Sequence, residues 1–259
     1  MTTGQTKKLV IGNLKMNILS PIERGRYLKD FSKAMAGKKL TTVMAVLCPP
    51  FVHLEQFRKS IKRQDVQIGA QNMFLLERGS FTGEVSAPML KSIGTEFVIL
   101  GHSERRRYFG EDEAVVNAKL KMALKCGLAP VVCIGDTHEQ RDSGDMKRIL
   151  RMQIEGALEG VPGGKLEQIV LVYEPVWAVG TDILPTSNEV LEAKILVKKI
   201  LTDLYGAKRT GIVRILYGGS VSARVAKQVC LDPAMDGVLV GRESLIPREF
   251  LKIAEIING

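Results

Sequence analysis

Three polar residues in this chain each follow a short apolar run, at the point where a β-strand would end. Lys15 comes after the first run, His102 follows Leu100-Gly101, and Glu174 follows Tyr173. Each has an ordinary explanation on its own, as surface charge, a core histidine or a solvated carboxylate. Together, an ammonium, an imidazole and a carboxylate form a set that can move a proton next to a carbonyl group.

Glycines end two later apolar runs, at Gly218-Gly219-Ser220 and at Gly241-Arg242. Tight turns alone would explain these glycines. Such turns are also where parallel barrels bind phosphate, because the backbone N–H groups of the turn point at the anion. All five features follow predicted strands, so the sequence indicates proton-transfer chemistry beside an anion site.

Eight apolar runs, each followed by an amphipathic segment, would have to position these residues. They are rich in Val and Ile and lack polar alternation, as expected for parallel strands buried on both faces. An apolar stripe predicts a helix from Asn188, and similar patterns predict helices over 113–125 and 222–230. The runs are 9–11, 43–47, 66–68, 97–100, 131–134, 169–172, 212–216 and 238–240.

Alternation of strands and helices predicts an α/β fold with a parallel sheet. Eight such units fit a chain of 259 residues, and eight repeats close a (β/α)8 barrel. We therefore expect one catalytic barrel domain over residues 1–259. An open doubly wound sheet is the alternative, but no GxGxxG motif follows the first run, so its dinucleotide-binding version lacks support. In such a barrel, the active site lies at the carboxyl ends of the strands.

The charge balance favours anionic partners. The chain has 37 Lys and Arg against 28 Asp and Glu, a net charge of +9, which suits a phosphorylated small molecule, nucleic acid or an acidic membrane surface. Aromatic residues make up only 5% of the chain, and they do not alternate with basic residues. Binding to single-stranded nucleic acid requires such alternation, because aromatic side chains stack on the bases while basic ones contact the phosphates. Nucleic-acid binding is therefore not expected as the main role. Basic clusters that invite the idea are 7–8, 58–59, 62–63 and 105–107.

Neither a membrane span nor a disulfide framework is expected. No apolar stretch approaches 18 uninterrupted residues. The four cysteines lack CxxC spacing, which is typical of reduced thiols in a cytoplasmic protein.

The chain resembles the triosephosphate isomerase family nearly from end to end. The resemblance implies a TIM barrel that interconverts dihydroxyacetone phosphate and glyceraldehyde 3-phosphate, a glycolytic and gluconeogenic step, with neither cofactor nor metal. A related isomerase of a four-carbon ketose phosphate is the alternative. The motifs are GNLKMN at 12–17, GAQN at 69–72, FTGEVS at 81–86, LGHSERR at 100–106, YEPVWAVGT at 173–181, LYGGSV at 216–221 and LVG at 239–241.

The resemblance also implies roles for the catalytic residues. Glu174 would move a carbon-bound proton, and Lys15, assisted by Asn13, would stabilise the enediolate. His102 would donate a hydrogen bond as neutral imidazole, its pKa lowered by a helix that begins near Ser103. Glu104 would orient Lys15.

Substrate binding and assembly follow from the same resemblance. The phosphate of the triose would lie on the backbone N–H groups of Gly180, Ser220, Gly241 and Arg242. Residues 175–186 would form a lid that excludes water from the enediolate. The loop between Gln71 and Ser86 would reach a second subunit and make a homodimer, with Thr82 near the partner's active site.

Some positions depart from the family pattern. Leu14 stands where an aromatic residue is usual, and Arg242 stands where a second glycine is usual. In the lid, the backbone N–H that Tyr217 would bind falls at Pro185, which has none. We therefore predict that Tyr217→Phe has little effect on ligand binding.

Overall fold

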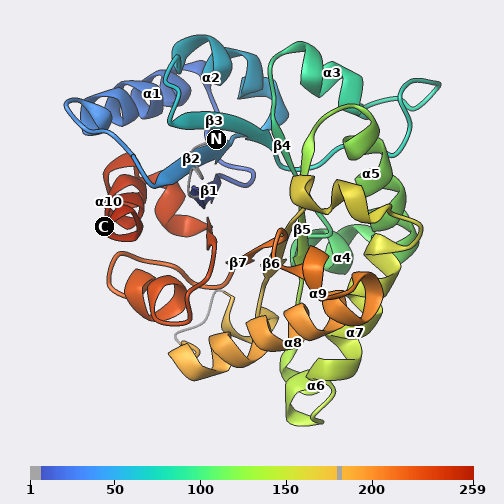
Figure 1. Ribbon diagram of the computed structural model, residues 1–259. Coiled ribbons are helices and arrows are strands. Elements are labelled where there is room, and N and C mark those ends of the chain that lie inside the picture. Colours follow the sequence, from blue (N-terminus) through green and yellow to red (C-terminus); the bar gives the residue numbers. More distant parts are fainter. Residues whose placement is uncertain (1–6, 180–182) are drawn as a thin grey trace.

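The computed structural model describes residues 7–179 and 183–259. Its parallel strands close into a barrel in the order β1-β2-β3-β4-β5-β6-β7-β8 (Figure 1). The predicted (β/α)8 barrel is thereby confirmed, and each apolar run contributes one strand. The strands are β1 (Lys8–Asn13), β2 (Val43–Cys48), β3 (Val66–Ala70), β4 (Phe97–Leu100), β5 (Ala129–Ile134), β6 (Val170–Tyr173), β7 (Arg214–Tyr217) and β8 (Gly237–Val240).

Helices surround the barrel on its outer side (Figure 1). The α-helices are α1 (Pro21–Met35), α2 (Leu54–Ser60), α3 (Ala87–Ser92), α4 (Ser103–Phe109), α5 (Glu113–Lys125), α6 (His138–Asp142), α7 (Met146–Leu158), α8 (Ser187–Tyr205), α9 (Ala207–Thr210) and α10 (Pro247–Asn258). Shorter or irregular helical turns are η1 (Phe51–His53), η2 (Gly163–Gln168), η3 (Val176–Ala178), η4 (Lys227–Leu231) and η5 (Arg242–Leu245).

The strand sequences are almost uniformly apolar because both faces of each strand are buried. One set of side chains, including Ile11, Val131 and Leu216, fills the barrel interior. The alternate set, including Val10 and Val132, packs with the helices in a separate outer cluster. This alternation is expected of strands that lie between a packed interior and a helical layer.

The three predicted helices differ in outcome. The helix over 113–125 is confirmed as α5, and the one from Asn188 as α8, which begins one residue earlier. The prediction of a helix over 222–230 is wrong in its extent, because residues 222–225 form no helix and the helical segment begins only at Ala226, directly before the π-helical η4. Apolar spacing does not distinguish a wide π-turn from an α-turn over so few residues.

Strand register places the ends of β5, β6 and β7 side by side. Ile134 pairs with Tyr173 and Tyr173 pairs with Tyr217. Gly135 follows β5, and a Cβ atom there would lie 1.8 Å from the carbonyl oxygen of Glu174. Only glycine lets the two strand ends approach this closely, so Gly135 makes room for the residue predicted to be the base.

Candidate active site

Glu174 lies directly after β6 and is almost completely buried, with 2% of its surface exposed. Its Oε1 atom is 3.0 Å from His102 Nε2, and its Oε2 atom accepts a hydrogen bond from the backbone N–H of Ser103 at 3.1 Å. His102 lies in the turn between β4 and α4, and Ser103 is the first residue of α4. The structure therefore brings together two predicted catalytic residues that are 72 positions apart in the chain.

His102 is the residue immediately before α4. Its Nδ1 atom accepts a hydrogen bond from the backbone N–H of Glu104 at 3.3 Å. Because this nitrogen accepts, the proton of a neutral ring lies on Nε2, which faces Glu174. The helix that was expected to begin near Ser103 thus fixes the tautomer of His102.

Electrostatic coupling between these two groups shifts both pKa values. Burial is the largest single influence on Glu174 and raises its pKa, but His102 and the Ser103 N–H together hold it below its ordinary value. Burial likewise lowers the pKa of His102, yet the Glu174 and Glu104 carboxylates raise it above its ordinary value. The sequence prediction of a lowered His102 pKa is wrong for this arrangement, because the Glu174 and Glu104 carboxylates together outweigh burial, the largest single influence.

Lys15 reaches the same end of the barrel from β1. Its Nζ atom lies 2.6 Å from Glu104 Oε1, as the sequence predicted. The backbone at Lys15 has a φ of 52°, which is uncommon for a residue with a side chain. Its N–H donates to Asn13 Oδ1, and its carbonyl accepts from Gln71 Nε2, so the unusual turn is held from both sides.

A cavity of about 470 Å³ lies beside Lys15, at the ends of β7 and β8. Three predicted substrate-binding residues, Ser220, Gly241 and Arg242, line it. Ser220 Oγ donates to the carbonyl of Ala178 at 2.9 Å, which ties the cavity wall to η3. Gly180, the fourth predicted phosphate ligand, lies outside the described residues.

A second cavity, of about 840 Å³, lies on the side of Glu174 and Ser103. Lys15 and Val179 line both cavities. An anion in the smaller cavity would therefore place an attached carbon chain between Lys15 and Glu174. This arrangement suits proton transfer in a phosphorylated molecule.

Comparison with known proteins gives a consistent result over the whole chain. The family model of triosephosphate isomerase matches residues 8–257. The triosephosphate isomerase of Alkaliphilus oremlandii is 41% identical over 249 residues, which cover 95% of this chain and 98% of that protein. The triosephosphate isomerase of Chloroflexus aurantiacus is 40% identical over 245 residues, with 95% and 97% covered. The chain belongs to the triosephosphate isomerase family. It is therefore an isomerase.

One residue that sequence reasoning missed lines the cavity of this family member. Arg224 lies in the loop after β7 and joins Lys15 and Arg242 around the smaller cavity. The sequence does place a basic residue four positions after Ser220, but the neighbouring residues do not indicate that its side chain lines the cavity. Among the described residues, Glu243 is the one carboxylate that lines this cavity, so the described part of its wall is predominantly positive.

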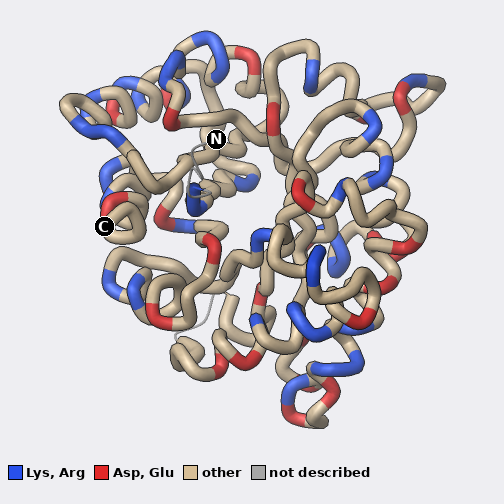
Figure 2. The backbone as a smooth tube through the Cα atoms, in the orientation of Figure 1, with Lys and Arg blue, Asp and Glu red and all other residues tan. Residues whose placement is uncertain are grey.

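Other expectations for this family member concern charge, metal and membrane. Figure 2 shows Lys and Arg distributed over the helices around the barrel and interspersed with Asp and Glu. Within residues 7–179 and 183–259, no group of three or more His, Cys, Asp or Glu could hold a metal ion. No helix in the described part of the chain is long and apolar enough to span a membrane.

The departure at Pro185 concerns the predicted lid of this family member. Pro185 accepts a hydrogen bond on its carbonyl from Gln228 Nε2 at 2.7 Å. Among the described residues, the buried hydroxyl of Tyr217 has no hydrogen-bond partner. The small effect expected of Tyr217→Phe stays a prediction.

Proposed function

We propose that this chain interconverts dihydroxyacetone phosphate and glyceraldehyde 3-phosphate, with Glu174 as the base. The observation that carries the proposal is the buried carboxylate of Glu174, 3.0 Å from His102 Nε2, facing a cavity that Lys15 also lines. Its lowered pKa keeps it ionised and ready to accept a proton at neutral pH.

The reaction requires Glu174 to exchange its present contacts for the substrate. Its carboxylate takes a proton from the carbon next to the carbonyl, which leaves an enediolate. It then returns the proton to the neighbouring carbon, while the hydroxyl proton passes from one oxygen of the enediolate to the other, so no atom is lost or gained overall. His102 Nε2–H, released by Glu174, donates to an oxygen of the enediolate, while the Lys15 ammonium stabilises its charge.

The phosphate group occupies the smaller cavity, on the backbone N–H groups of Ser220, Gly241 and Arg242, with Gly180 as a further donor. An anion there is favoured by Lys15 and Arg224 as well. Fixing the phosphate positions the reacting carbons, which lowers the entropic part of the barrier. A lid over residues 175–186 excludes water from the enediolate.

Replacing Glu174 tests the proposal directly. Glu174→Gln keeps the shape of the side chain and removes the proton acceptor, so kcat should fall by at least about 10²–10⁴. A coupled assay with glyceraldehyde 3-phosphate measures this, and Glu192→Gln, an exposed change on α8, is the control. Near wild-type turnover in Glu174→Gln would remove Glu174 from its role.

The active assembly is proposed to be a homodimer formed through the loop between Gln71 and Ser86. This loop protrudes between β3 and α3 (Figure 1), and Thr82 is exposed on it. Met16 and Leu19 are 89% and 82% exposed beside the active site, and a partner surface would cover such apolar side chains. Sedimentation velocity should give twice the chain mass of 28.5 kDa, and a species at the chain mass itself would contradict the dimer.

Two further attributes belong to the same proposal. A single catalytic domain over residues 1–259 is supported by the continuous closed barrel. A cytoplasmic location is supported by four free cysteines, because reducing compartments keep thiols unpaired.

A further inference from the structure

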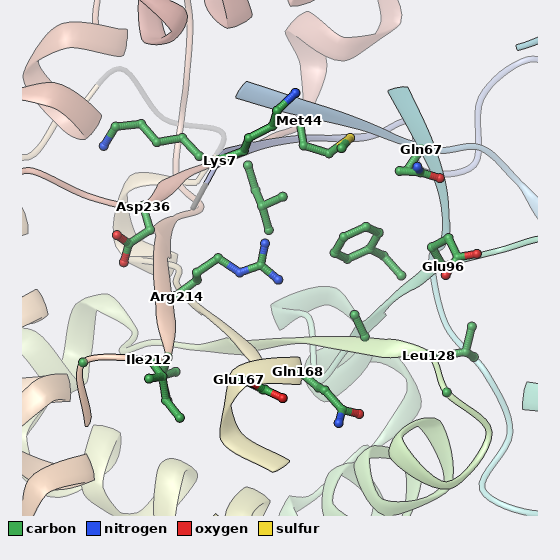
Figure 3. Close-up of a pocket in the computed structure, with 17 residues that line it drawn as sticks. Lys7, Met44, Gln67, Glu96, Leu128, Glu167, Gln168, Ile212, Arg214 and Asp236 are labelled. Carbon is green, nitrogen blue, oxygen red and sulfur yellow. The ribbon is translucent and has the colours of Figure 1, made fainter. Parts of the chain in front are cut away.

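A third cavity lies at the opposite end of the barrel from Glu174, and the proposed reaction makes no use of it. Its volume is about 970 Å³, and its walls come from the amino ends of the strands (Figure 3). This is within the size range of small-molecule sites. Lys8, Met44, Phe97, Ala129 and Arg214, each at or next to the start of its strand, are among the lining residues.

Most charged groups around this cavity already have partners. Lys7 and Lys8 donate to the carbonyls of Leu40 and Met235, at 3.2 and 2.6 Å. Glu96 pairs with Lys91 at 3.0 Å, and Asp236 Oδ2 accepts from the N–H of Ile215 at 2.8 Å. Glu167 is exposed at the rim, where water solvates its carboxylate.

Arg214 is the exception. Its guanidinium points into the middle of the cavity, whereas the Asp236 carboxylate points the other way (Figure 3). Among the described residues, no carboxylate lies within ion-pair distance of Arg214, and no atom accepts a hydrogen bond from its guanidinium. The side chain is half-buried, and burial lowers its pKa while Asp236 acts in the opposite direction. A partly desolvated cation with free donors is costly unless something else supplies the negative charge.

We propose that this cavity is a binding site for a small monocarboxylate with an apolar body. The planar guanidinium fork of Arg214 matches a carboxylate, which it would hold through two parallel hydrogen bonds. The apolar wall, which includes Leu9, Phe97 and Ala129, would contact the rest of the ligand.

Charge around the cavity selects a carboxylate over a phosphate. Arg214 is the one cation in the described lining that makes no side-chain hydrogen bond, whereas Lys7 and Lys8 each donate to a backbone carbonyl, so Arg214 is the group placed to hold a single negative charge. Glu96, Glu167 and Asp236 also line the cavity and would repel a second charge. A phosphate dianion is therefore disfavoured here, whereas three cations surround the smaller cavity at the catalytic end.

Butyrate is a suitable probe, and butyramide is its uncharged counterpart of the same shape. Met44 is the one methionine in the described lining of this cavity, so its methyl resonance in protein labelled with ¹³C-methyl methionine reports occupancy. Met44→Leu assigns the resonance. We expect saturable shifts with butyrate in the millimolar range and binding of butyramide weaker by about tenfold or more.

Variants then locate the charge that binds the probe. Arg214→Met should weaken butyrate binding about tenfold or more, and Arg214→Lys should weaken it less. Arg26→Met, which removes an exposed arginine on α1, should leave it unchanged, and turnover should stay near wild type in all three. Equal binding of butyrate and butyramide, binding that survives Arg214→Met, or no Met44 shift in the wild-type protein would each overturn the proposal. The shift of Met44 needs no variant of Arg214, so poor folding of Arg214→Met would not obscure the result.

Discussion

At the scale of single residues, the distinguishing feature of this site is the close contact between the proposed base, Glu174, and His102. Glu174 lies 3.0 Å from His102 Nε2, and each shifts the pKa of the other. Nδ1 of His102 is held as an acceptor by the Glu104 N–H. The ring can therefore present its Nε2–H to substrate once Glu174 turns toward the reacting carbon.

This coupling predicts a change in pH dependence. In His102→Gln the burial of Glu174 remains, but the main influence that lowers its pKa is lost, so the pKa rises. The acid limb of kcat/KM should move to higher pH, and kcat should fall by about 10²–10³ because a donor to the enediolate is lost. A pH–rate profile measures both. An unmoved acid limb would mean that another group keeps Glu174 ionised.

The pKa shifts of Glu174 and His102 also determine how the stability of the fold depends on pH. The lowered pKa of Glu174 stabilises the fold above the ordinary carboxyl value of 4.5, and this contribution is lost as pH falls through the folded pKa. The raised pKa of His102 stabilises the fold below 6.5, and this contribution is lost as pH rises through the folded pKa. The two residues together therefore contribute most to the stability of the fold between pH 4.5 and pH 6.5.

At the scale of elements, Arg141 links the two ends of the predicted lid. It lies on α6, and its Cζ atom is 3.8 Å from the centre of the Trp177 ring in η3. It also forms an ion pair with Glu189 on α8. Glu189 in turn accepts from the backbone N–H of Thr186 at 2.7 Å, which caps that helix. One guanidinium thus contacts segments on both sides of residues 180–182.

Arg141→Met should loosen this connection while preserving much of the side-chain volume. Because the cation–aromatic contact and the ion pair are each worth about 0.5–1 kcal/mol at partly exposed sites, we expect a phosphorylated transition-state analogue to bind several-fold more weakly. Trp177 is the only tryptophan, so its fluorescence follows the titration without background. Arg148→Met, which removes an ion pair with Asp145 away from the lid, is the control. Identical titrations for all three proteins would show that Arg141 does not position the lid.

At the scale of the whole molecule, a net charge of +9 and a positive catalytic cavity should attract an anionic substrate. We expect kcat/KM to fall as ionic strength rises, because salt screens exposed charges beyond about 10 Å at 0.1 M. Arg224→Met should lower kcat/KM about two- to fivefold at low salt and flatten the salt dependence. Arg26→Met changes the net charge equally, but Arg26 is not among the residues that line the cavity. If the two variants respond alike, net charge rather than Arg224 attracts the substrate.

The sequence by itself determined the strands of the barrel and the end of the barrel at which the proposed catalytic residues lie. Eight apolar runs became the eight strands of the barrel, because apolar residues that are buried on both faces leave a local pattern. Lys15, His102 and Glu174 all lie at the carboxyl ends of strands, since a parallel barrel brings every strand end to one rim. Glu104 was likewise placed beside Lys15, 2.6 Å away.

Only the tertiary structure decided how these groups affect one another. The direction of the His102 pKa depends on a carboxylate 72 positions away in the chain, so neighbouring residues gave the wrong sign. Arg224 and Arg214 are ordinary basic residues in the sequence, yet one lines the catalytic cavity and the other the cavity at the opposite end. Electrostatic effects depend on distance and burial, and both are set when the barrel closes.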